Sequence, residues 1–460
     1  MRLPRLFKAP KDANKNKVMI AQDFYLEKSP NLDAAKNLLS NYLLRFKPDL
    51  NIAFSIALPI EHVNDDEFYS NTKNILRFFY QNKDLKKQYF GMGVSNLIKE
   101  DTQEKTLSLL MSSKNNLGEQ QIYFGGLRFD ENAFISPQWQ DFGKAMFVLP
   151  LVLLGKINTN YFLQVNYTPN NFINFDAWKD MAQTLINLLG KNSLDLDKPK
   201  IRLINSPSKT AYEKVMQKAL SSFSNTNKKV VLGRRNDFLI DSSLNSLNLI
   251  HMLKALHKNT FIFLLDLGNA QAFFGSSPEL LFSKDGHDLK TEALAGSKIN
   301  HNPFSKKDLL EHEFVSKFIK DIFENKFNTQ LKASELEIKK LAHIAHLRQK
   351  FFAHMPHITE KELILNLHPT PAVCGFGVNF AKNFIARNEG FDRGYYAGAL
   401  GIISKESSEF CVAIRSGLMN KNNLYVYAAC GIVEGSGIDV EWAELDAKQK
   451  SILDIFNNTF

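Results

Sequence analysis

The segment that most constrains this chain lies near its C-terminal end, where small residues lead directly into a helix. Residues 428–437 are rich in alanine and glycine, which predicts a small-residue strand and a glycine-rich turn. The helix that follows carries Glu441, Glu444 and Lys448 at spacings of three and four, so their side chains share one face. That face continues with Ile452, which predicts that it points inward. Charged groups on an inward face require a bound partner that compensates their burial.

An ordinary salt bridge is the alternative interpretation of this helix face. Glu444 and Lys448 form an i,i+4 pair, which contributes only about 0.2–0.5 kcal/mol on an exposed helix. Taken alone, the helix does not decide between the two interpretations. A second acidic pair elsewhere in the chain favours the functional one.

The second acidic pair lies in a helix predicted over residues 305–327. Asp308 and Glu311 are three residues apart, on a face that continues with Val315. Ser305 followed by Asp308 resembles a capping box, which would explain Asp308 without any ligand. Capping does not explain Glu311, an acid on a core-facing stripe.

Two helices that each present an acid-x-x-acid face can supply oxygen ligands to one hard cation. The acids are Asp308 and Glu311 on the first helix, and Glu441 and Glu444 on the second. Because carboxylates are the only ligands on offer, Mg²⁺ is favoured over zinc, and it would keep waters and take a carboxylate or phosphate from a substrate.

The composition indicates a soluble globular protein of the reducing cytoplasm. The chain has 460 residues, 44% of them hydrophobic and 23% charged, enough for a large core. The apolar run at 147–154 is too short to span a bilayer. Three cysteines cannot all pair and show no metal-ligand spacing. The net charge of +9 comes from scattered lysines rather than a basic stripe, so it favours a small anionic substrate over nucleic acid.

Helices and strands are predicted in blocks rather than in strict alternation, which favours an α+β fold with antiparallel or mixed sheets. Residues 1–16 are polar and basic and are expected to be flexible. Residues 190–210 are the best candidate for a linker. Mostly strands are predicted over residues 50–167. Further helices are predicted over residues 34–46, 175–189, 211–223 and 333–353, and further strands over residues 229–232, 261–267, 272–274, 280–282 and 288–293 and around the turn 420–423.

Seven blocks of the C-terminal half, in chain order, resemble the chorismate-utilising enzymes, and within that family most closely the isochorismate synthases. The N-terminal half is similar more loosely, around residues 137–142. The resemblance implies two mostly antiparallel β-sheets packed face to face and flanked by helices. Residues 17–460 would then form one unit, with an N-terminal subdomain of about 17–200, a catalytic part of about 201–460, and residues 190–210 as a surface connection. The seven blocks are residues 229–234, 275–280, 294–297, 308–315, 367–373, 391–398, and 414–416 with the 428–437 segment.

The resemblance also implies a reaction, the Mg²⁺-dependent isomerisation of chorismate to isochorismate. Water adds at ring carbon 2 while the carbon 4 hydroxyl leaves, which requires a base on one side and an acid on the other. In the family pattern, Lys229 is the base that activates water and Glu279 is the acid that protonates the leaving hydroxyl. Burial would move both pKa values toward neutrality, that of Lys229 downward and that of Glu279 upward.

The family pattern assigns the remaining site residues as well. It implies that Glu311 and Glu444 bind Mg²⁺ directly and that Asp308 and Glu441 act through water. The residues expected to contact the substrate are Gly296, Ser297, Arg415, Lys448, Ala429 and Gly431. Ala429 and Cys430 depart from the glycine and alanine that are usual there, and the added methyl of Ala429 is expected to tighten or shift the pocket.

Relatives within the family catalyse different reactions. Aminodeoxychorismate-forming enzymes carry a lysine where this chain has Ala295, and anthranilate synthases need a glutaminase partner, which is not expected here. Salicylate synthases share Lys229, Glu279 and the metal acids, then eliminate pyruvate, and they are the main alternative. A non-catalytic basic protein that binds an anion or nucleic acid is the remote alternative. We expect a cytoplasmic monomer that binds chorismate, without nucleic acid or membrane, and feeds menaquinone or siderophore synthesis.

Overall fold

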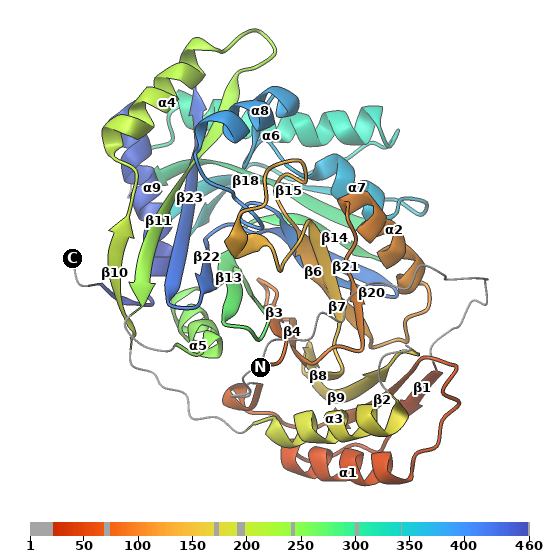
Figure 1. Ribbon diagram of the computed structural model, residues 1–460. Coiled ribbons are helices and arrows are strands. Elements are labelled where there is room, and N and C mark those ends of the chain that lie inside the picture. The colour runs from red at the N-terminus through yellow and green to blue at the C-terminus, as the bar shows by residue number, and fades with distance from the viewer. Residues whose placement is uncertain are drawn as a thin grey trace.

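Two β-sheets form the centre of the molecule (Figure 1). The computed structural model describes residues 22–68, 74–169, 174–190, 198–240, 244–299, 303–341 and 343–458, so the segment 1–16 lies outside the described residues. The larger sheet has 14 strands in the order β1-β2-β9-β8-β4-β3-β12-β13-β22-β23-β11-β10-β24, with β19 beside β11. Its strands are β1 (Gln22–Tyr25), β2 (Phe54–Ile60), β3 (Arg77–Gln81), β4 (Lys87–Met92), β8 (Val152–Ile157), β9 (Asn160–Tyr167), β10 (Lys200–Asn205), β11 (Lys229–Ile240), β12 (Phe261–Asp266), β13 (Gln271–Ser277), β19 (Gly375–Phe376), β22 (Ser416–Asn420), β23 (Asn423–Val433) and β24 (Asn457–Asn458).

The second sheet has ten strands in the order β16-β18-β15-β14-β21-β20-β6-β7-β5, with β17 beside β18. Within the described residues, only the pairs β1–β2 and β10–β24 run parallel among the strands of both sheets. The strands of the second sheet are β5 (Asn96–Ile98), β6 (Ile122–Leu127), β7 (Ala145–Leu149), β14 (Leu280–Asp285), β15 (Asp288–Ile299), β16 (Lys332–Ala333), β17 (Glu337–Lys340), β18 (Ile344–His354), β20 (Ala399–Ser404) and β21 (Ser407–Val412).

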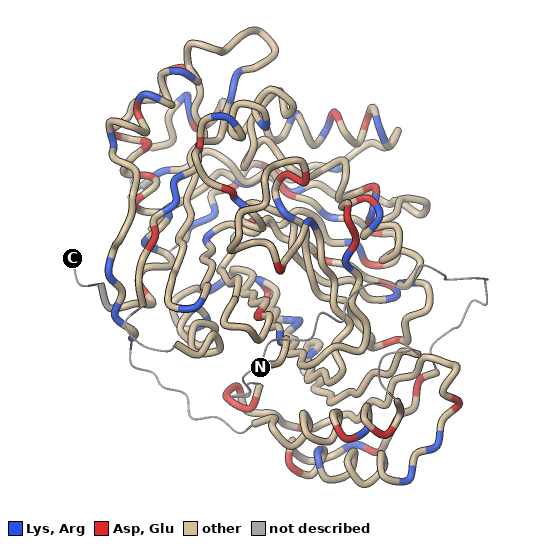
Figure 2. Tube along the Cα trace, in the orientation of Figure 1, with Lys and Arg blue, Asp and Glu red and all other residues tan. Residues whose placement is uncertain are grey.

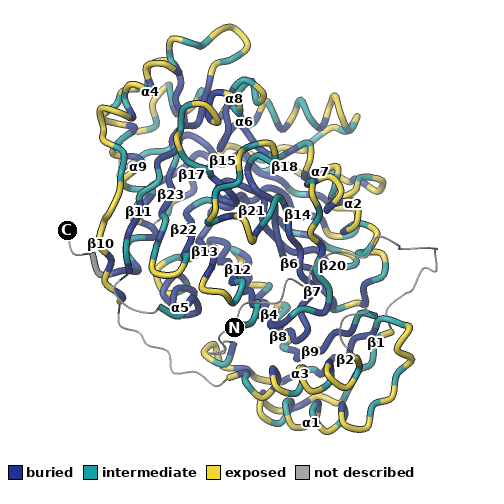
Figure 3. Tube along the Cα trace, viewed as in Figure 1, coloured by how far each residue is buried: buried dark blue, intermediate teal, exposed yellow. Residues whose placement is uncertain are grey.

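The two sheets pack face to face through apolar side chains. Phe78 of β3 and Phe124 of β6 stack with their ring centroids 4.5 Å apart, which joins the larger sheet to the second one. The strands are mostly buried, whereas the helices expose one side (Figure 3). Aromatic contacts of this kind bury large apolar areas and dominate core energetics. The structure confirms the predicted α+β fold with two mostly antiparallel, face-packed sheets.

The helices cover the outer faces of the sheets and the top of the molecule in Figure 1. The helices α1 and α3 lie side by side over the strands β2, β8 and β9. The helices α6 and α9, which carry the two acidic pairs, pack against the strands β15 and β23. The helices are α1 (Leu32–Arg45), α2 (Gln103–Lys114), α3 (Phe175–Leu188), α4 (Lys209–Ser221), α5 (Ser246–Leu256), α6 (Lys306–Asn325), α7 (Glu360–Leu367), α8 (Val378–Asn388) and α9 (Ile438–Leu453).

Most predicted elements are confirmed, and one prediction is wrong. The structure has helices close to the residue ranges 34–46, 175–189, 211–223 and 305–327, and α9 begins at Ile438. The predicted helix 333–353 does not exist, because this segment forms β16, β17 and β18. Its Ala, Leu, Glu and Lys content favours a helix, but β18 pairs with β15 along the whole stretch from Ile344 to His354. Tertiary pairing overrides weak local propensity here.

Strands from both halves of the chain share each sheet. In the larger sheet β3 pairs with β12, and in the second sheet β6 pairs with β20. The 190–210 segment contains β10, an exposed strand next to β11. None of the helices in the described ranges combines the length and apolar character needed to cross a bilayer. Lys and Arg positions are spread over the trace, with Asp and Glu between them (Figure 2).

Candidate active site

One cavity gathers most of the residues that the sequence singled out. Its walls come from β11, β15, β18 and β23, from the turn after β13, and from the helices α6 and α9. The remaining three predicted residues, Asp308, Glu441 and Glu444, lie behind this lining on α6 and α9. The nine predicted residues that line the cavity are Lys229, Glu279, Gly296, Ser297, Glu311, Arg415, Ala429, Gly431 and Lys448.

Lys229 enters the cavity from the first position of β11. This strand end is fixed on both sides, because Lys229 pairs with Val433 of β23 and with Phe376 of β19. The ammonium nitrogen Nζ lies 3.4 Å from Oε2 of Glu311, and the side chain is 1% exposed. Burial lowers the pKa of Lys229, and the nearby Glu311 only partly opposes this shift. The direction is the one expected for a lysine that serves as a base.

Gly431 makes room for this pair. A Cβ atom at this position would lie 2.6 Å from Oε2 of Glu311 and 2.7 Å from Cε of Lys229. Only glycine therefore allows β23 to approach so closely. This supports the prediction that Gly431 belongs to the site.

Glu279 lies across the cavity from β11, directly after β13 and Pro278. Its amide N–H donates to Oγ of Ser277, and the Ser277 hydroxyl donates to the carbonyl of Val412. The residue is 3% exposed. Burial raises the pKa of Glu279 to about 8, and the negative charge of Glu292 contributes to the shift. A carboxyl group in this state can donate a proton near neutral pH.

The acids of α6 and α9 face each other with a lysine between them. Nζ of Lys307 lies 2.6 Å from Oε1 of Glu441 and 3.2 Å from Oε1 of Glu311. Nζ of Lys448 lies 2.5 Å from Oε1 of Glu444. Burial alone would raise the pKa of Glu444, but Lys448 and Lys307 lower it below its ordinary value. Glu444 is therefore ionised and compensated by ammonium groups, whereas burial raises the pKa of Glu441 even beside Lys307.

The donor set of this cluster suits Mg²⁺, although it is not preassembled. Both carboxylate oxygens of Glu441 are buried without a hydrogen bond, despite the close Lys307 ammonium. A hard cation would satisfy such oxygens. Within the described residues, no three acidic, histidine or cysteine side chains already converge as a metal site. Binding would require Lys307 to move aside.

Asp308 has a structural role at the start of α6. Its Oδ2 accepts hydrogen bonds from the amide and the hydroxyl of Ser305, and the Asp308 amide donates to Oγ of Ser305. This is the capping box that the sequence offered as the alternative explanation. A role for Asp308 at a metal stays a prediction.

A hydrogen-bonded chain runs along one side of the cavity. Arg415 donates from Nη2 to Nε2 of His346, and Nδ1 of His346 lies 3.0 Å from Oγ of Ser297. The Ser297 hydroxyl in turn helps to lower the pKa of Glu444. Burial and the charge of Arg415 lower the pKa of His346 well below its usual value, so this histidine is neutral. Arg415 is thereby fixed with its guanidinium at the cavity.

Two backbone features shape the same side. Gly296 has φ +74°, and a Cβ there would lie 2.4 Å from the carbonyl oxygen of Asp308, so glycine is required twice over. The Lys448 ammonium donates to the carbonyl of Ala429, which holds it at the cavity. Cys430 points the other way, and its Sγ lies 3.1 Å from the hydroxyl of Tyr212.

Sequence reasoning missed Lys307 and His346. Lys307 lies four residues before Glu311, a spacing that predicts a contact on a helix, but its pairing with Glu441 on another helix is not visible in the sequence. His346 lies in the segment wrongly predicted as a helix. Recognition of β18 as a strand beside β15 would have placed His346 opposite Ser297, its register partner.

Comparisons with known proteins identify the family. The profile of the chorismate binding enzyme family matches residues 43–457. A chloroplastic isochorismate synthase of Catharanthus roseus is 31% identical over 358 residues, which cover 72% of this chain and 61% of the relative. Isochorismate synthase MenF of Pasteurella multocida is 30% identical over 383 residues, 77% of this chain and 83% of the relative. The chain thus spans about three fifths of the plant relative's length.

Solved structures show the same fold. MenF, the menaquinone-specific isochorismate synthase of Escherichia coli, superposes with a TM-score of 0.78 at 23% identity, covering 93% of this chain and 100% of that chain. Anthranilate synthase component I of Streptococcus pneumoniae superposes with a TM-score of 0.62 at 16% identity, covering 89% and 96%. At these identities the likeness speaks for the fold alone. Because the family profile matches nearly the whole chain, the protein belongs to the chorismate binding enzyme family.

Proposed function

We propose that this protein is an isochorismate synthase, which isomerises chorismate to isochorismate with Mg²⁺. The observation that carries the proposal is that Lys229 and Glu279 face one cavity together with the cationic side chains of Arg415 and Lys448. A base, an acid and two cations match a reaction that moves a hydroxyl group on a dianionic ring. The named isochorismate synthases among the relatives support it.

The two reacting side chains divide the proton transfers. Lys229 takes a proton from the water that attacks ring carbon 2, and Glu279 gives a proton to the hydroxyl that leaves carbon 4 as water. One water enters and one leaves, so the product is an isomer of the substrate. The raised pKa of Glu279, about 8, keeps this acid protonated at neutral pH.

The other residues hold the substrate. Arg415 can offer a planar fork to one carboxylate, and the amides of Gly296 and Ser297 can approach the ring closely. Glu311 and Glu444 would hold Mg²⁺ directly, and Asp308 and Glu441 would act through water. When bound, the ion supplies a positive charge that grips the other carboxylate.

Product analysis tests the proposal. The protein is incubated with chorismate, with and without Mg²⁺, and the products are separated by chromatography beside a pyruvate assay. We expect isochorismate without stoichiometric pyruvate. Salicylate with pyruvate would instead show a salicylate synthase, and no turnover in either condition would refute both and favour a non-catalytic basic protein.

Two neighbouring lysines provide a matched control. Lys229→Ala is expected to abolish turnover, whereas Lys228→Ala removes an exposed lysine one position earlier and is expected to leave turnover unchanged. Glu279→Gln is expected to match Lys229→Ala. Equal activity of Lys229→Ala and Lys228→Ala would exclude Lys229 as the base.

We also infer that the isochorismate feeds menaquinone or siderophore synthesis in the cytoplasm. The relatives include MenF enzymes and a vibriobactin-specific isochorismate synthase. The three cysteines are free and buried, as expected for a reducing compartment. We expect a monomer without a glutaminase subunit, which light scattering after gel filtration would test.

A further inference from the structure

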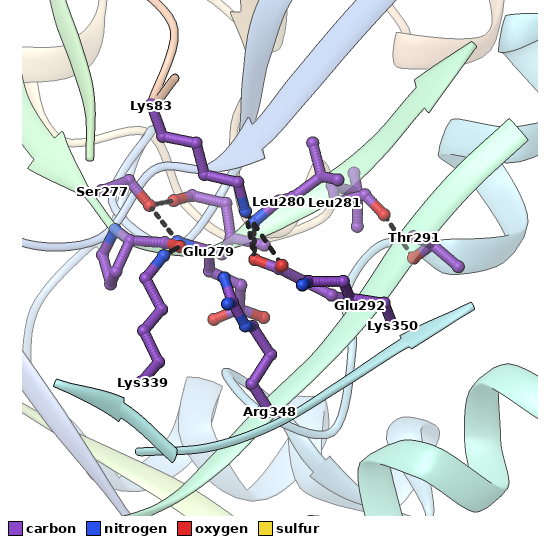
Figure 4. A network of polar contacts seen from close by, with 12 residues as sticks. Lys83, Ser277, Glu279, Leu280, Leu281, Thr291, Glu292, Lys339, Arg348 and Lys350 are labelled. Atoms are coloured by element: carbon purple, nitrogen blue, oxygen red, sulfur yellow. Dashed lines mark hydrogen bonds and ion pairs between the residues drawn. The ribbon is translucent and has the colours of Figure 1, made fainter. Parts of the chain in front are cut away.

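Behind Glu279 lies a second buried carboxylate that the proposed reaction does not use. Glu292, on β15, has a fully buried side chain whose two oxygens lie 2.8 and 2.9 Å from Nζ of Lys83 (Figure 4). Lys83 lies between β3 and β4, 209 positions before Glu292 in the chain. The N-terminal half thus sends a cation into the wall of the cavity.

The same carboxylate holds the backbone next to Glu279. Oε1 of Glu292 accepts a hydrogen bond from the amide of Leu280, the residue directly after Glu279. On the other side of the turn, Lys339 of β17 donates to the carbonyl of Pro278 at 2.6 Å. The turn is therefore fixed on both sides of Glu279 by charged side chains (Figure 4).

The pKa of Glu292 is lowered whereas that of Glu279 is raised, and the charge of Glu292 links the two shifts. Burial alone would raise the pKa of Glu292, but Lys83, Lys339 and the Leu280 amide lower it, so Glu292 is an anion. After burial, that anion is the main cause of the raised pKa of Glu279. Burial also lowers the pKa of Lys339 to about 7, so Lys339 is only partly charged at neutral pH. Lys83 is therefore the main cationic partner of Glu292.

Other charged and titratable groups from several elements face this pair. They come from both sheets, from α9 and from the segment after β21. These groups are Lys229 of β11, Lys290 of β15, Cys411 of β21, Arg415, and Lys448 of α9. Figure 4 shows Arg348 and Lys350 of β18 beside the same pair.

A purely structural ion pair is the simpler explanation, but it fits less well. Burial of two charges costs several kcal/mol per ion, and well-packed apolar residues often serve stability as well. The Lys83–Glu292 pair contacts the turn that carries Glu279, and the charge of Glu292 opposes the ionisation of Glu279. The pair therefore has a use beyond stability. Glu360 shows the contrast, since it is equally buried and paired with Lys114 but is not among the main causes of the raised pKa of Glu279.

We propose that Glu292, held by Lys83, is a positioning residue for Glu279: it fixes, through the Leu280 amide, the turn that carries this acid and places a fixed negative charge beside it. The inference rests on the proposed function, in which Glu279 donates a proton. It gives the N-terminal half a part in catalysis through Lys83.

The first test removes the charge and keeps the shape. Glu292→Gln can still accept the Leu280 hydrogen bond but has no negative charge. Loss of one neighbouring charge lowers the pKa of Glu279 by about one unit. Isochorismate formation should therefore fall about tenfold at about pH 9 and change little at about pH 6. A merely structural role would lower the rate equally at all pH values.

The second test does not depend on turnover. Difference infrared spectroscopy against Glu279→Gln isolates the carbonyl stretch of protonated Glu279, which is followed as the pH rises. We expect the midpoint of its loss to fall by about one pH unit in Glu292→Gln. Glu360→Gln, which removes an equally buried and paired carboxylate, should leave the midpoint unchanged.

Variants of Lys83 test the connection to the N-terminal half. Lys83→Met leaves Glu292 buried without its partner, so Glu292 takes up a proton and the midpoint shifts as in Glu292→Gln. Lys83→Arg keeps the charge and should keep the wild-type midpoint. The double variant Lys83→Met/Glu292→Gln should show no further shift, because one interaction is lost in both.

The outcomes separate this inference from the proposed function. An unchanged midpoint in Glu292→Gln, or an equal shift in Glu360→Gln, overturns the inference even if the wild type makes isochorismate. A shifted midpoint in a protein that never converts chorismate upholds the coupling and refutes the proposed function.

Discussion

Two buried glutamates of the candidate site, one lining the cavity and one behind its lining, are held in opposite states. Glu279 and Glu444 are 3% and 6% exposed, so burial disfavours the charge of both. Yet the pKa of Glu279 is raised to about 8, whereas that of Glu444 is lowered. The difference lies in the neighbours. Lys448 is 2.5 Å from Glu444, while the largest charge effect on Glu279 comes from another carboxylate, Glu292.

The comparison shows that the groups around a buried acid decide whether it is ionised or protonated. Paired with Lys448, Glu444 of α9 is an anion, and in the proposed function it would exchange an ammonium group for a metal cation. Beside Glu292, the acid of the β13–β14 turn retains a proton that it can give away. Pairs of titratable groups whose environments separate their pKa values mark acid–base sites in general.

The largest expected effect comes from removal of the charge of Glu311 or Glu444, the two acids that would bind the metal directly. Glu311→Gln and Glu444→Gln should each lower Mg²⁺-dependent isochorismate formation by about 1,000-fold, because each would remove a direct ligand and a fixed charge. Calorimetric titration with Mg²⁺ should show binding weakened by more than about 100-fold. Glu360→Gln is the control. If both variants bound Mg²⁺ with wild-type affinity, neither Glu311 nor Glu444 would be a ligand of the metal.

The second effect concerns Lys307, the cation that stands between the acids. Lys307→Met leaves Glu441 and Glu311 without this partner, which costs about 3 kcal/mol when a buried pair is broken. Thermal unfolding without metal should show this loss, and Mg²⁺ should restore more stability to the variant than to the wild type. Lys306→Met, at an exposed neighbouring lysine, should behave as the wild type does. Equal Mg²⁺ stabilisation in all three proteins would contradict the proposed exchange.

The third effect is the pH dependence of turnover and of stability that the protonated Glu279 carboxyl imposes. Glu279 acts while protonated, so turnover should fall as the pH rises through about 8, by about tenfold per unit above it. The folded protein binds this proton more tightly than the unfolded chain, so stability should also fall as the pH rises from about 4.5 to about 8. Glu279→Gln should lack that fall in stability. A turnover profile that stays flat to about pH 10 would contradict the assignment.

Local patterns in the sequence predicted the two acidic helices well. Amphipathic spacing and the Ser305 cap placed α6 within two residues of its observed ends, and the glycine-rich turn placed the start of α9. Both signals act within a few residues, and here no long-range strand pairing competes with them. The family resemblance then brought residues from seven blocks to one site, and nine of twelve line one cavity.

Contacts between distant segments could not be read in this way. Lys83 and Glu292 are 209 positions apart, and Lys307 meets Glu441 from another helix. The segment of His346 and Lys339 looked helical because its residues favour helices, while the pairing of β18 with β15 and of β17 with β18 decides its conformation. What decides the state of each glutamate is thus tertiary, even where the glutamate itself is evident.

The smallest expected effect separates the two interpretations of Asp308. Ser305→Ala and Asp308→Ala each break the capping box, so each should lower the stability of the metal-free protein by about 1 kcal/mol. Mg²⁺ affinity should fall about tenfold in Asp308→Ala alone, because only that variant removes a carboxylate that would act through water. Chemical denaturation and calorimetric titration measure the two effects independently. If both variants bind Mg²⁺ as the wild type does, Asp308 only caps α6. Glu441 is then the one acid of the two helices that would act on the metal through water.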